Sequence, residues 1–221
     1  MRFDKHGKVR FTSHRDVARI WERALRRAGL PVAYTEGFSP RPRLSFGLAL
    51  STGYESDGEY FDVDLLDGPD GPADLDGLAG RLDPALPPGM SVQAVRGLEA
   101  GAASLQQAVT SCGWRIPVPG VAVAAVEAAA DRVLAASSLP TEVERKGEPA
   151  IEDVRPGIVE LAVEGDGEVS VVLAELATQP RATRPADLLA ALDPSWVPGT
   201  ITRTHQWTLV DGARREPLPL A

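Results

Sequence analysis

One order of strands and helices occurs twice along the chain, and this repeat constrains the fold more than any other feature. In the first half, hydrophobic periodicity and turn residues indicate strands at 8–12, 44–50, 59–65 and 91–98 and helices at 14–28 and 73–82. In the second half, they indicate strands at 111–117, 158–163, 169–176 and 201–210 and helices at 121–136 and 185–192. Each half therefore has the order strand-helix-strand-strand-helix-strand, which predicts an α+β fold of two tandem ferredoxin-like (split βαβ) units packed together.

The predicted division falls where glycine and small residues cluster, at residues 100–104. We expect a first unit at 1–102, a second unit at 103–213 and a loose, proline-rich tail at 214–221. The segment 141–153 is an addition to the second unit, because it lies between a helix and a hairpin of the repeat.

Charge is distributed very unevenly in this 221-residue chain, whose net charge is −8. Residues 1–43 contain eleven Lys and Arg against four Asp and Glu, a local net charge of +7. The rest of the chain is strongly acidic. A chain that is acidic overall can still present a local positive field to an anion, so the basic end is the first place to seek a ligand.

Several classes of protein are excluded by composition. The only cysteine, Cys112, rules out an internal disulfide framework and a cysteine-built metal or iron–sulfur site, and we expect no cofactor and no metal. No apolar run approaches the roughly 18 residues that a membrane span needs. The charged N-terminal sequence is not a secretory signal, so we expect a cytoplasmic protein.

The basic end contains an amphipathic helix with clear boundaries. Ser13 is typical of an N-cap, with Asp16 three residues later, and Gly29 followed by a proline ends the helix. The apolar residues follow helical spacing and predict that Trp21 is buried, while the opposite face carries arginines.

This helix and the turn-rich loop after it supply the candidate site. The exposed N–H groups of a helix start favour an anion, and cations interleaved with an aromatic ring suit single-stranded nucleic acid. The predicted anion- or RNA-binding residues are Ser13, His14, Arg15, Arg19, Arg23, Arg26, Phe38, Arg41 and Arg43. His14 is the candidate catalytic residue, because an imidazole changes protonation near neutral pH.

Each of these features also has a purely structural interpretation. Ser13 can be only a cap, the arginines only a solvated helix face, and Phe38 a side chain buried in the core. Two basic spots, at Arg145 and Arg155, either extend the anion surface or serve the structure. These alternatives stay open at the level of sequence.

Several segments resemble the radical SAM-linked protein family of bacteria. They are Lys8–Asp16, Trp21–Ala28, Tyr34–Pro42, Glu55–Val63, Val143–Gly147 and Asp153–Pro156. The resemblance implies a radical S-adenosylmethionine enzyme as a partner. The chain itself cannot be that enzyme, since its cluster needs three cysteines close in sequence.

Three functions compete at this stage. The first, which we favour, is a non-catalytic RNA-binding or substrate-presenting accessory protein for RNA modification or processing, so RNA is the expected partner. The second is a metal-independent endoribonuclease in which His14 is the general acid or base and Arg15 or Arg41 stabilises the transition state. The third is a protein-interaction scaffold whose basic face meets an acidic partner.

Overall fold

The computed structural model describes residues 1–66, 75–99, 101–145, 147–165 and 169–220. The chain forms two compact units. Unit 1 consists of residues 1–109 together with 210–221, and unit 2 of residues 110–209. Unit 1 is therefore discontinuous, whereas the sequence led us to expect that it ends at residue 102. Both units combine helices with β-strands, which confirms the α+β class.

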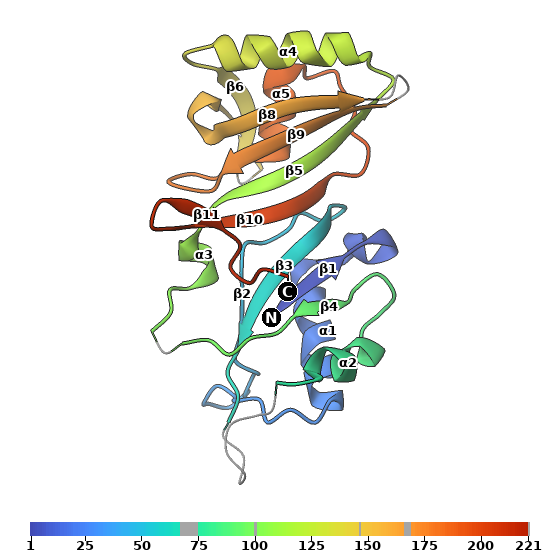
Figure 1. The fold of residues 1–221 in the computed structure, drawn as a ribbon, viewed down its shortest axis with the longest axis vertical. Helices are drawn as coiled ribbons and strands as arrows, with labels where there is room; N and C mark the ends of the chain where they lie inside the picture. Colours follow the sequence, from blue (N-terminus) through green and yellow to red (C-terminus); the bar gives the residue numbers. More distant parts are fainter. Residues whose placement is uncertain (67–74, 100, 146, 166–168, 221) are drawn as a thin grey trace. The chain divides into compact units, whose positions relative to one another are not determined.

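In unit 1, a central pair of strands has one further strand on each side (Figure 1). β1 pairs with β3 and β4, and β2 pairs with β3, all antiparallel, so the strand order is β4-β1-β3-β2. Its strands and α-helices are β1 (Arg2–Lys5), α1 (His14–Arg27), β2 (Leu44–Phe46), β3 (Glu55–Val63), α2 (Leu78–Leu82), β4 (Val92–Ala94), α3 (Leu105–Ala108) and β11 (Ala213–Arg215). Two short 3₁₀ helices, Gly7–Phe11 and Asp83–Ala85, complete this unit.

The core of unit 1 is built around three aromatic rings. The ring centroid of Trp21 lies 5.0 Å from that of Phe3 and 4.6 Å from that of Phe61, so α1 packs against the central strands. The side chain of Trp21 is completely buried, as the helical spacing predicted, while Arg19, Arg23 and Arg26 are exposed. The amphipathic reading of α1 is thus confirmed.

The predicted strand at residues 8–12 is wrong. The first strand is β1, and residues 7–11 form a 3₁₀ helix instead. The alternation rested on Val9 and Phe11 alone, and only Val9 is buried, whereas Phe3 enters the core. Two apolar residues in five are too weak a pattern to outweigh the pairing of β1 with β3.

The C-terminal residues belong to unit 1 rather than forming a loose tail. Arg2 Nη1 donates a 2.5 Å hydrogen bond to the carboxylate of Glu216 and a 3.4 Å bond to the carbonyl of Leu218. The side chain of Leu218 is buried. The expectation of a loose tail overlooked this apolar anchor and the buried arginine that holds it.

In unit 2, the strand order is β10-β5-β9-β8, and the central β5–β9 pair is antiparallel (Figure 1). Helix α4 packs against β8, β9 and α5. The elements of unit 2 are β5 (Val109–Pro119), α4 (Val123–Ala135), β6 (Pro140–Arg145), β7 (Glu148–Asp153), a 3₁₀ helix (Arg155–Gly157), β8 (Ile158–Gly165), β9 (Val169–Ala177), α5 (Pro185–Leu192) and β10 (Thr202–Val210).

The addition predicted at 141–153 is a hairpin of its own. β6 and β7 pair antiparallel from Pro140 opposite Asp153 to Arg145 opposite Glu148 and form a separate two-stranded sheet. This hairpin packs against α5. Among the described residues, no helix is long and apolar enough to cross a membrane.

Candidate functional site

The start of α1 is organised by its cap. Ser13 Oγ accepts a 3.2 Å hydrogen bond from the backbone N–H of Asp16 and donates a 2.7 Å bond to the Asp16 carboxylate. The same carboxylate accepts a 3.1 Å bond from Arg19. The Ser13 hydroxyl and then Arg19 lower the pKa of Asp16 below its usual value. Ser13 and Arg19 are therefore occupied by Asp16 and are weak candidates for binding an anion.

The other arginines of α1 have no carboxylate partner of this kind in the described part of the chain. Arg15, Arg23, Arg26 and Arg27 are exposed, and none forms an ion pair with any residue that the structure describes. Three of them, Arg23, Arg26 and Arg27, line one open hollow of about 560 Å³, whose other wall is formed by residues 84–87. The sequence placed Arg27 on the helix face but gave no reason to include it in the site.

His14 lies away from this hollow. Its ring meets that of Phe46 edge-on, with 5.2 Å between the ring centroids. It lines a small cavity of about 20 Å³ together with Lys5 and Glu59, both of which are buried. The Lys5 ammonium also donates to two backbone carbonyls, with the shorter bond, 3.2 Å, to Thr12.

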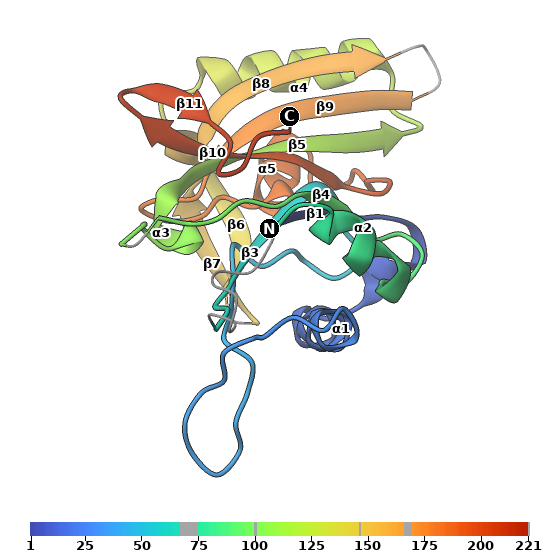
Figure 2. The same cartoon turned by 60° about the horizontal axis from the view of Figure 1, so that its bottom comes forward.

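The loop between α1 and β2 forms a projecting hairpin, here called the aromatic loop (residues 33–43). Arg43 N–H donates a 2.9 Å bond to the Ala33 carbonyl, and Thr35 N–H donates a 2.9 Å bond to the Arg41 carbonyl. Figure 2 shows this loop standing out from α1 and the strands of unit 1. Phe38 at its tip is fully exposed, so the reading of Phe38 as a core residue is wrong.

The two arginines of the aromatic loop differ in their surroundings. Arg41 is exposed and forms no ion pair within the described ranges. Arg43 lies 3.7 Å from the carboxylate of Asp64, and both side chains are about half exposed. Of the loop arginines, Arg41 is therefore the one with an unbalanced charge.

A second exposed aromatic near α1 was missed by the sequence analysis. Phe11 is 61% exposed, and the guanidinium of Arg10 lies 4.5 Å from its ring centroid. The sequence signal, an Arg-Phe pair just before the helix cap, was hidden because we assigned these residues to a strand.

His6 is the other residue that sequence reasoning missed. Its two ring nitrogens lie 3.4 Å from the Glu55 carboxylate and 3.2 Å from the Asp57 carboxylate. These two acids are thus engaged with a histidine. Among the described residues, no group of three or more His, Cys, Asp or Glu could hold a metal ion.

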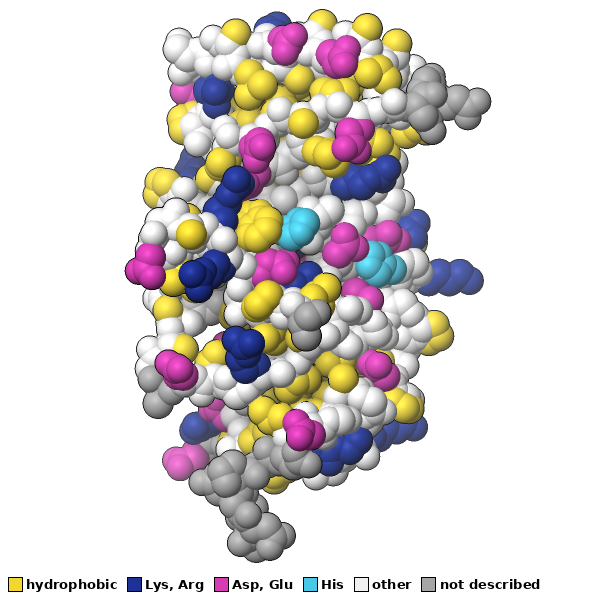
Figure 3. All heavy atoms as spheres, viewed as in Figure 1, with side chains coloured by type: hydrophobic (Ala, Val, Ile, Leu, Met, Phe, Trp, Pro, Cys, Tyr) yellow, Lys and Arg dark blue, Asp and Glu magenta, His cyan; other side chains and the backbone are white. Residues whose placement is uncertain are grey.

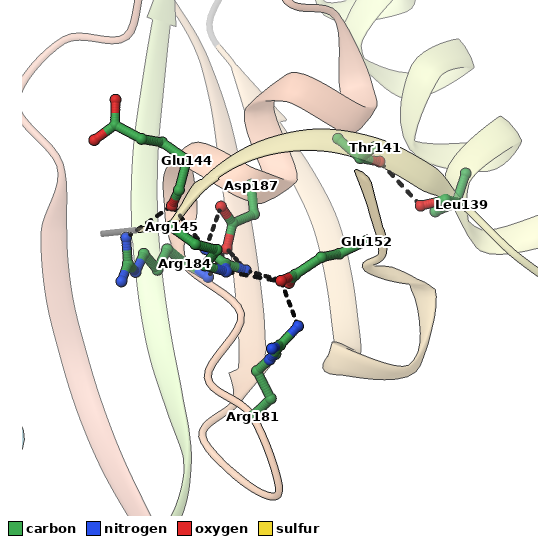
Figure 4. Close-up of polar contacts among 8 residues, drawn as sticks. All are labelled: Leu139, Thr141, Glu144, Arg145, Glu152, Arg181, Arg184 and Asp187. Carbon is green, nitrogen blue, oxygen red and sulfur yellow. Dashed lines mark hydrogen bonds and ion pairs between the residues drawn. The ribbon is translucent and has the colours of Figure 1, made fainter. Parts of the chain in front are cut away.

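The basic spot at Arg145 serves the structure of unit 2 (Figure 4). Its guanidinium donates to both oxygens of Asp187 at 3.1 and 3.0 Å and to Glu152 at 2.8 and 3.1 Å. Arg181 also pairs with Glu152. The hydrogen bonds from Arg145 lower the pKa of Glu152. Two carboxylates neutralise this arginine, which leaves little charge for an external anion.

Arg155 is engaged in the same way by backbone groups. Its guanidinium donates to the carbonyls of Leu134 and Ala136, at the C-terminal end of α4, and to that of Ile158. A cation at a helix C-terminus satisfies carbonyls that have no partner within the helix. Both basic spots of unit 2 therefore serve contacts within that unit.

Figure 3 shows one face of the molecule, on which Lys and Arg side chains are interspersed with Asp and Glu. A mixed surface of this kind gives no strong field of one sign. The arginine hollow on α1 is therefore distinguished by having three cations and no acidic residue in its lining.

Comparison with known proteins identifies a family but no activity. Residues 1–185 match the family described as "Uncharacterized protein conserved in bacteria (DUF2344)", and the chain belongs to this family. No curated protein matches the sequence.

Proposed function

We propose that this member of a conserved bacterial family binds single-stranded RNA through unit 1 and acts as a non-catalytic accessory protein in RNA modification or processing. The observation that carries the proposal is the hollow lined by Arg23, Arg26 and Arg27, with no acidic partner among the described residues. Three guanidinium groups around one open space suit the oxygens of a phosphate backbone.

The chain as a whole supports a local anion site rather than a general affinity for nucleic acid. Its net charge of −8 repels a polyanion, so binding requires a concentrated positive patch. The exposed rings of Phe11, beside Arg10, and of Phe38 add apolar faces, as expected for a surface that meets unpaired bases.

Two finer points form part of the proposal. We interpret the strand orders β4-β1-β3-β2 and β10-β5-β9-β8 as two ferredoxin-like units, a fold that hosts many functions and so does not name one. The resemblance described above favours a radical S-adenosylmethionine enzyme as the partner to which the bound RNA is presented. With one cysteine, the chain would depend on that partner for the cluster.

An endoribonuclease is the second candidate, and one observation favours it. His14 shares a small cavity with Lys5 and Glu59, so three groups able to exchange protons or stabilise charge line the same space. This cavity is about 20 Å³, room for a water molecule but not for a nucleotide, so we rank this function second.

The test compares two double variants with equal loss of charge. Arg23→Gln with Arg27→Gln removes two cations of the hollow. Arg19→Gln with Arg43→Gln removes two cations that already face carboxylates. The first variant should weaken binding of a labelled single-stranded RNA and lower the slope of log K against log salt by about 1.4, because each phosphate contact contributes about 0.7.

The control variant should bind nearly as well as the wild-type protein. Equal effects of the two double variants, or no RNA binding by the wild-type protein at low salt, would refute the proposal. The same incubations in EDTA, run on a denaturing gel, test the second candidate. RNA cleavage that disappears in His14→Ala would establish a ribonuclease instead.

A further inference from the structure

The aromatic loop carries a feature that electrostatic binding does not explain. Phe38 is fully exposed at the tip of a hairpin, although burying an aromatic side chain is strongly favourable. Its neighbours along the chain are two small residues, Gly37 and Ser39.

The stem of the loop is braced by hydrogen bonds below this ring. Besides the two backbone bonds given above, Arg41 N–H donates a 3.0 Å bond to Thr35 Oγ1, and Tyr34 pairs with Pro42. Gly37 has φ of +120°, a conformation that favours glycine, and it lets the chain turn just before the ring. A braced stem lowers the backbone freedom that the loop loses on binding.

The charges around the ring fit a nucleic acid strand. Arg41 has no ion pair among the described residues, whereas Arg43 faces the carboxylate of Asp64. Glu36 is the one acid between Ala33 and Arg43. Tyr34, at the base of the stem, is half exposed and offers a second ring.

We infer that the aromatic loop is a stacking platform, on which Phe38 stacks against an unpaired base while Arg41 meets the adjacent phosphate. The inference rests on the proposed function and makes it more specific, because it assigns the selectivity for single strands over duplexes to one loop. Base–aromatic stacking tolerates any base, so it provides this selectivity without sequence readout.

The test uses a single-stranded RNA 12-mer containing 2-aminopurine, and the same strand annealed into a duplex. With the wild-type protein, the 2-aminopurine fluorescence of the single strand should change on binding. Phe38→Leu should remove that change and weaken single-strand binding about 5- to 150-fold, the range expected for losing one stacked base. Phe38→Trp should keep both, and the duplex affinity should be equal in all three proteins.

Each other outcome has a definite meaning. If Phe38→Leu binds the single strand with unchanged affinity and unchanged fluorescence, while Arg23→Gln with Arg27→Gln binds weakly, the platform is refuted and the proposed function stands. If the wild-type protein binds no RNA, both are refuted. If Phe38→Leu retains RNA binding but loses a co-purifying protein, the tip contacts a protein and the inference is wrong. Equal melting temperatures of the variants verify that the fold is intact.

Discussion

Replacing Arg145 by methionine should destabilise unit 2 more than any nearby surface change. The substitution keeps a long apolar side chain but removes the hydrogen bonds to Asp187 and Glu152 (Figure 4). The side chain of Asp187 is only 3% exposed, so its negative charge would stay buried, with the hydrogen bond from the backbone N–H of Arg184 retained.

The expected loss follows from these exposures. Removing one member of a fully buried ion pair costs about 3–5 kcal/mol, and a surface pair is worth about 0–1 kcal/mol. The Arg145 side chain is 20% exposed, so its loss should be closer to the value for a buried pair than to that for a surface pair. We expect the free energy of unfolding to fall by about 2–4 kcal/mol. Arg181→Met is the matched control: it removes a pair to the same Glu152, but Arg181 is 68% exposed, and the loss should stay below about 1 kcal/mol.

Equilibrium urea unfolding of the full chain measures both variants. A second substitution isolates the cause: adding Asp187→Asn to Arg145→Met removes the buried charge while keeping a side-chain acceptor for α5, and should recover about 1 kcal/mol or more. If Arg145→Met and Arg181→Met lose the same stability, or if Asp187→Asn recovers nothing, the hairpin is not held by this network and the reasoning fails.

Three further predictions concern stability and titration. Glu152 has a lowered pKa in the folded protein, so its contribution to stability is complete above the ordinary glutamate pKa and is lost as pH falls through the lowered value. The urea midpoints of the wild-type protein and Arg145→Met should therefore approach each other as pH falls below the ordinary glutamate pKa, about 4.3, and a constant difference would contradict this. Trp21→Ala should lower the stability of the protein by about 3–5 kcal/mol, and an unchanged melting temperature would show that α1 has another register. Ser13→Ala should lower the free energy of unfolding by about 0.5–2 kcal/mol, because the N-cap of α1 is lost. NMR titration of this variant should show a higher pKa for Asp16, closer to its ordinary value, and an unchanged pKa would show that the Ser13 hydroxyl is not what lowers it.

Local signals predicted the elements whose causes are local. Ser13, the apolar stripe through Trp21 and Gly29 specify α1 within one stretch of chain, and the helix runs from His14 to Arg27 with Ser13 as its cap. The predicted helix at 185–192 coincides with α5 for the same reason. By contrast, the short alternation at 8–12 lost to long-range pairing of β1 with β3.

The candidate site was harder to predict because charge balance depends on distant partners. Arg145 and Arg23 look alike in the sequence, but Arg145 meets Asp187, 42 residues away, whereas Arg23 lies in a hollow without acids. The exposure of Phe38 likewise depends on a hairpin stem whose hydrogen bonds the sequence does not display. The sequence indicated the basic helix face and the loop after it but did not assign Arg27 or Phe11 to the site, and only the structure separates the cations that form ion pairs from those that do not.

The discontinuity of unit 1 has a consequence during synthesis of the protein. Residues 110–209 are translated before the segment that contributes Glu216 and Leu218. The hydrogen bond from Arg2 to Glu216 can therefore form only after the interval in which unit 2 is synthesised. At about 5–20 residues per second, this interval is on the order of 5–20 s. The unit whose synthesis begins first is therefore the last to be completed.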